Sequence, residues 1–179
     1  MSSSDLVRWG GLAAIAGGVV WVVEGLLLLI LAIPESAVTD GLFSIAALCT
    51  VGGFVGFHAL QKDDYGRIGR GGLWTVVVAT LALVLGLIVS SLGSTALEGP
   101  FFPVVTLAVF TGFVLYGAAT LQVRVLPRWC GIGFIVGPFL FIILGDFGAI
   151  LFGLLWLALG YVLWSQRDTA VGQPAPRVS

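Results

Sequence analysis

The sequence predicts an all-α integral membrane protein of six transmembrane helices, arranged as three hairpins. The first observation behind this prediction is composition: 59% of the 179 residues are hydrophobic and 9% are charged, whereas about a quarter of a typical soluble domain is charged. The mean hydropathy of +1.12 agrees. The second observation is that the apolar residues form long runs, as membrane-spanning helices require, and not the short alternating segments of a β-barrel.

The first four helices follow directly from the lengths of these runs. A helix needs about 20 apolar residues to cross a bilayer. The predicted helices are 9–33, 41–60, 71–91 and 101–123. The first run is longer than the apolar part of a secretory signal, which has about 7 to 15 residues, and no convincing cleavage site follows it. We therefore expect it to remain as the first helix.

The last apolar run, from Trp129 to Trp164, is too long for one helix. As a single helix it would extend roughly 54 Å, against a hydrocarbon core of about 30 Å. The turn-forming segment Gly145–Gly148 is predicted to divide it into helices 129–144 and 149–164. A re-entrant segment, leaving five spans, is the alternative. Residues 1–164 thus form a single transmembrane domain, and 165–179 is predicted to be a disordered cytoplasmic tail.

The basic residues predict the orientation of this bundle. With six helices they all fall on one side of the membrane, and only acidic residues occupy the opposite loops. The basic residues are Arg8, Lys62, Arg67, Arg70, Arg124, Arg128, Arg167 and Arg177, and the acidic ones are Glu35, Asp40, Glu98 and Asp146. Because basic residues accumulate on the cytoplasmic side, both termini are expected there, in a plasma membrane of the bacterial type. Five helices would place Arg167 and Arg177 outside.

Each predicted hairpin begins with a similar motif. Arg8–Gly11, Arg70–Gly72 and Arg128–Gly131 each precede an outward-going helix. A three-fold internal repeat would explain this similarity, because some transporters contain internal duplications. The alternative is that every cytoplasmic helix end needs arginine, tryptophan and glycine for the same physical reasons.

The 26 glycines predict close contacts between helices. Gly52 and Gly56 form a G-x-x-x-G motif, and Gly11 with Gly18 and Gly153 with Gly160 recur at a spacing of seven residues. Lipid provides little hydrophobic drive between helices, so close backbone approach at small residues supplies the association. We expect most of these contacts inside the bundle and some in a homo-oligomer or with other membrane subunits.

Glu24 is the ionisable residue that lies well inside a predicted span. About 16 residues of helix place it about 24 Å beyond Arg8, in the outer part of the hydrocarbon layer. No lysine or arginine reaches that depth. Glu24 is therefore either protonated, because burial disfavours its charged form, or in contact with external water, a cation or a cationic ligand.

Several hydroxyl and carboxyl groups are expected at or just above the depth of Glu24, and together they would form a polar pocket that faces outward. The candidate ligand-binding residues are Glu24, Ser44, Ser90, Ser91, Thr106 and Asp146. The alternative is a protonated Glu24 that joins helices through one hydrogen bond to a hydroxyl.

Other kinds of site are not indicated. His58 is the one histidine, and no acidic or cysteine residue at helical spacing completes a metal or haem site. Cys49 and Cys130 are predicted at different depths, too far apart for a disulfide. Lys62 is expected in a solvated loop beside Asp63 and Asp64. No cofactor is predicted.

Two functions follow from these observations. The favoured one is binding or passage of a small ligand or cation through the pocket around Glu24, and the alternative is an accessory subunit in a larger membrane assembly. An enzyme is less favoured, because the metallopeptidase, serine hydrolase and phosphate-loop motifs do not occur. The net charge of -1, with no basic stripe, makes nucleic acid an unsuitable partner. Membrane lipids are the expected surroundings.

Overall fold

A computed structural model describes residues 3–31, 36–62, 64–92, 99–123 and 125–166. Within these ranges the chain forms six helices and no strand. The helices are α1 (Ser3–Leu31), α2 (Ala37–Gln61), α3 (Arg67–Ser91), α4 (Phe101–Val123), α5 (Arg128–Leu144) and α6 (Asp146–Ser165). Five of them are long and apolar enough to cross a membrane, and α5 is shorter, with 17 residues. The predicted helical membrane bundle is confirmed, and of the predicted tail only 165 and 166 lie within the described residues.

A glycine separates α5 from α6, where the sequence predicted the last turn. Gly145 has φ 55° and ψ -131°, a conformation that only glycine adopts without strain. Its amide donates to the carbonyl of Phe141 at 3.0 Å, and the amide of Gly148 donates back to the carbonyl of Gly145 at 2.8 Å. The long run from Trp129 to Trp164 is thus two antiparallel helices, which gives the third hairpin.

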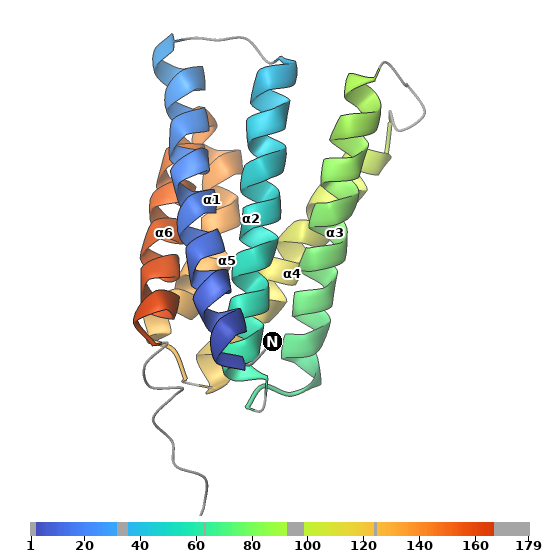
Figure 1. The fold of residues 1–179 in the computed structure, drawn as a ribbon. Coiled ribbons are helices and arrows are strands. Elements are labelled where there is room, and N and C mark those ends of the chain that lie inside the picture. The colour runs from blue at the N-terminus through green and yellow to red at the C-terminus, as the bar shows by residue number, and fades with distance from the viewer. Residues whose placement is uncertain (1–2, 32–35, 63, 93–98, 124, 167–179) are drawn as a thin grey trace, which may run out of the picture.

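The six helices form a closed ring in chain order. Each helix packs on the next, and α1 closes the ring by packing on α6 over most of its length. Figure 1 shows the helices running alternately in opposite directions, so that α1 begins and α6 ends at the same end of the bundle.

Glycines on two faces of α1 hold it against both of its neighbours. A Cβ added at Gly18 would lie 2.7 Å from the carbonyl oxygen of Gly153 in α6, and one added at Gly56 in α2 would lie 2.7 Å from the Cα of Gly10. Such close backbone approach is possible because glycine has no side chain at the contact. The predicted seven-residue spacing of glycines therefore marks packing within the bundle.

The third face of α1 points to the centre of the ring. Ala14 and Trp21, seven residues apart, are 0% and 4% exposed. In the inner half, meaning the half nearer the start of α1, this centre is filled by stacked and edge-to-face rings. These are Phe54 and Phe57 of α2, Phe113 and Tyr116 of α4, Phe134 of α5 and Trp156 of α6. We call these six residues the aromatic plug.

The contact between α1 and α2 yields a test of the packing. Gly56→Ala should destabilise the protein by about 1–3 kcal/mol through overpacking against Gly10, which exceeds the gain of about 0.5–1 kcal/mol that alanine brings to a helix. The matched control is Gly71→Ala, because a Cβ there meets nothing within 4 Å. Thermal unfolding in detergent measures both variants. Equal stability of the two would contradict the packing described.

Candidate functional site

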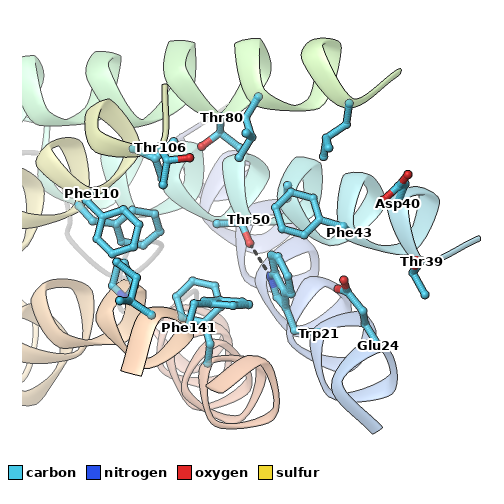
Figure 2. A pocket seen from close by; sticks show the side chains of 18 of the residues that line it. Trp21, Glu24, Thr39, Asp40, Phe43, Thr50, Thr80, Thr106, Phe110 and Phe141 are labelled. Carbon is cyan, nitrogen blue, oxygen red and sulfur yellow. Dashed lines mark hydrogen bonds between the residues drawn. The ribbon is translucent and has the colours of Figure 1, made fainter. Parts of the chain in front are cut away.

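Three side chains on one face of α1 begin the site. Trp21, Glu24 and Leu28 follow one another at intervals of three and four residues, which places them on the same side of a helix. This is the side that α1 turns toward the centre, so the acid of α1 points inward beside a tryptophan ring (Figure 2).

The facing side of α2 contributes the opposite wall. Asp40, Phe43, Ala47 and Thr50 also recur every three or four residues, and all four line the same cavity. The indole Nε1 of Trp21 donates a hydrogen bond of 3.2 Å to Thr50 Oγ1, drawn as the dashed line in Figure 2. This bond fixes the tryptophan ring across the gap between the two helices.

Between these walls lies a cavity of about 420 Å³, to which all six helices contribute. It occupies the outer half of the ring, from Leu28 and Asp40 down to Phe113 and Phe152 at the edge of the aromatic plug. Most of its wall is aliphatic or aromatic. Its polar side chains are Glu24, Thr39, Asp40, Thr50, Thr80 and Thr106. This combination of apolar walls and a few polar groups is typical of a small-molecule site.

Glu24 is the polar group of this wall whose surroundings are most unusual. Its side chain is 6% exposed, and within the described ranges its Oε2 atom has no hydrogen-bond partner. The charged groups that act on it are the carboxyls of Asp40 and Asp146, both of the same sign. The nearby protein charges therefore repel a carboxylate at this position and do not compensate it.

Of the predicted site residues, the structure brings Glu24 and Thr106 to the cavity wall. The other four are not among the lining residues. Ser44 Oγ donates to the carbonyl of Asp40, and Ser91 Oγ to that of Ile88, each at 2.8 Å. Ser90 Oγ is buried without a partner in the described part of the chain. Asp146 is exposed at the start of α6. The ligand-binding role of all six stays a prediction.

The aromatic wall of the cavity, formed by Trp21, Phe43, Phe141 and Phe152, was not predicted from the sequence. The ring centroid of Trp21 lies 5.1 Å from that of Phe43, 5.0 Å from Phe141 and 5.6 Å from Phe152. Trp21 is not among the predicted site residues, although it lies one helical turn before Glu24. Asp40 was placed in an outer loop, but it lies in the first turn of α2 and lines the cavity.

His58, at the opposite end of the bundle, is engaged in a structural contact. Its Nδ1 shares a hydrogen bond with the phenol of Tyr65 in the α2–α3 loop. Burial raises the pKa of Tyr65 to about 12, so this phenol keeps its proton at neutral pH and can donate it to the imidazole. Nearby Gln61 is 1% exposed, and its amide has no partner among the described residues.

In the described ranges no three histidine, cysteine or acidic residues come together in a group that could hold a metal ion. The chemistry that the cavity offers is therefore that of one buried carboxyl group with a second acid, Asp40, and several aromatic rings. No family model, curated protein or solved structure matches this chain.

Proposed function

We propose that this multi-pass membrane protein binds a small, positively charged ligand in the outer cavity, with Glu24 as its counter-charge. The observation that carries the proposal is the carboxyl of Glu24, which is 6% exposed, has an unpartnered oxygen within the described structure, and lines a cavity of about 420 Å³. Buried ionisable groups in membrane helices commonly face a cavity and mark the path of a ligand or ion.

The energetics of burial favour a cationic ligand over a neutral one. Burying an ion costs several kcal/mol of desolvation free energy unless an opposite charge compensates it. Asp40 and Asp146 add to this cost, and a cation beside Glu24 would remove it. An acid that only joined helices would hydrogen-bond a neighbouring hydroxyl, and the orphan Oε2 counts against that role.

The aromatic plug bears on the choice between binding and passage. Phe54 lies 4.9 to 5.4 Å, between ring centroids, from Phe113, Tyr116, Phe134 and Trp156. These rings fill the centre of the bundle on the inner side of the cavity. The arrangement supports binding from the outer half, and passage would require the plug to open.

Glycines that faced away from the bundle would favour the accessory subunit. The glycines of this chain give that alternative little support. Those within the helices mostly meet other helices of the same chain, as Gly112 meets Val76 and Gly117 meets Gly131. Internal packing is therefore sufficient to explain them.

We also propose that both termini lie in the cytoplasm, in a plasma membrane of the bacterial type. The basic residues of the described ranges gather at the end where α1 begins and α6 ends (Figure 1). They are Arg8, Lys62, Arg67, Arg70 and Arg128. Arg124, Arg167 and Arg177 lie outside the described residues. Such a one-sided distribution is typical of a cytoplasmic face.

Cysteine labelling tests this orientation. In a chain whose Cys49 and Cys130 are replaced by alanine, Glu98→Cys should react with a membrane-impermeant thiol reagent added to intact cells, because the proposed orientation puts position 98 on the outer side. Asp168→Cys should react only after the cells are opened. Labelling of Asp168→Cys from outside would overturn the orientation.

Replacement of Glu24 tests the binding site. Binding of monovalent cations, from potassium to alkylammonium ions, is measured by calorimetry on protein in nanodiscs. Glu24→Gln should keep the thermal stability, because glutamine has the same shape, but weaken binding at least about thirtyfold, since loss of a buried charge partner costs about 2 kcal/mol or more.

The matched control is Asp64→Asn, which removes an exposed acid at the other end of the bundle and should leave affinity unchanged. Equal affinity of the parent and Glu24→Gln for every cation that binds would refute the proposed role of Glu24.

A further inference from the structure

We infer that the ligand is an organic ammonium ion with N-alkyl groups and an aromatic or similarly bulky apolar body, recognised by the rings of the cavity together with Glu24. This inference rests on the proposed function and specifies its ligand. It depends on four properties of the cavity: its rings, its hydrogen-bonding capacity, its size and the place of its charge.

The rings form one packed cluster on one side of the cavity. Trp21 stands edge-on to Phe43, Phe141 and Phe152 at interplanar angles of 88°, 68° and 78°, and Phe141 lies 5.0 Å from Phe152. All four of these residues line the cavity, so part of the cluster's aromatic surface borders its volume. Alkylammonium groups are attracted to aromatic faces, and tryptophan provides the strongest attraction.

Two of the four wall hydroxyls are already engaged in hydrogen bonds within the protein. Thr50 Oγ1 accepts from Trp21, and Thr39 Oγ1 both accepts from the amide of Ser36 and donates to its carbonyl. A hard metal ion takes about six to eight oxygen ligands, and no cluster of metal-ligating side chains occurs in the described parts of the chain. A cation whose nitrogen is already alkylated needs few hydrogen bonds, and it fits this wall better.

The size of the cavity points to more than a small ammonium group. At about 420 Å³ it lies within the range of small-molecule sites, about 300–1,000 Å³. Its apolar residues continue inward past the charge, to Phe113 and Phe152. A ligand that filled it would place an apolar body among these rings.

Glu24 fixes where the positive charge lies. It follows Trp21 by one helical turn on the inward face of α1, and both line the cavity. A cationic head beside Trp21 would therefore meet an aromatic ring and a carboxylate together. A neutral apolar molecule would leave this carboxyl without a partner, so the geometry favours the cation.

Three probes of graded chemistry test the inference. They are benzyltrimethylammonium, its neutral carbon isostere neopentylbenzene, and tetramethylammonium, which lacks the ring. Binding to the full chain in nanodiscs is measured by calorimetry, with empty nanodiscs as the blank. Benzyltrimethylammonium should bind at least about tenfold more tightly than either of the other two, because it alone combines the charge with the aromatic body. This comparison needs no variant.

Variants of Phe43 then test the aromatic wall. Phe43→Leu should weaken benzyltrimethylammonium binding by about fivefold or more, whereas Phe43→Tyr, which keeps the ring, should retain most of it. The control is Phe147→Leu, which removes an exposed ring on α6 outside the cavity and should change nothing.

The other outcomes separate this inference from the proposed function. If potassium or tetramethylammonium binds best, with dependence on Glu24 but not on Phe43, the aromatic ligand is refuted and cation binding stands. If neopentylbenzene binds as tightly as benzyltrimethylammonium and Glu24→Gln has no effect, both are refuted. Absence of binding of benzyltrimethylammonium at millimolar concentration also refutes the inference.

Discussion

The whole arrangement depends on the close approach of α1 to both α2 and α6. In lipid the apolar side chains of a helix gain little by touching another helix, so backbone contact at small residues must hold the bundle together. Gly10 serves this purpose toward α2, and Gly11 and Gly18 toward α6. With two faces of α1 held in this way, its third face is directed to the centre, and that face carries Trp21 and Glu24.

Closure of the ring also divides its centre into two parts. Toward the inner end, large rings such as Phe54, Phe134 and Trp156 fill the space and are at most 1% exposed. Toward the outer end, the wall residues leave a cavity of about 420 Å³. An acid in the inner part would be sealed among rings, whereas Glu24 reaches a volume large enough for a ligand. The position of one carboxyl along α1 thus gives the cavity its chemical character.

Much of the fold could be predicted from the sequence, because helix number depends on local properties. The lengths of apolar runs gave the helices, and Gly145 marked the last turn. Glu24 was recognisable because an acid in an apolar run is rare.

The aromatic wall could not be predicted, since it requires α1, α2, α5 and α6 to be placed around one volume. The serines show the same limit: Ser44 and Ser91 were chosen by depth, but depth does not specify the direction around a helix, and both bond their own backbone.

The central claim is that Glu24 is ionised and paired with the bound cation. Infrared difference spectroscopy of the protein in nanodiscs, with and without saturating benzyltrimethylammonium, tests it most directly, and Glu24→Gln identifies the signal of this side chain. We expect the carboxylate bands of Glu24 in the complex, with no protonated carboxyl band that the variant lacks. A protonated Glu24 band that persists unchanged while the ligand is bound would contradict the account.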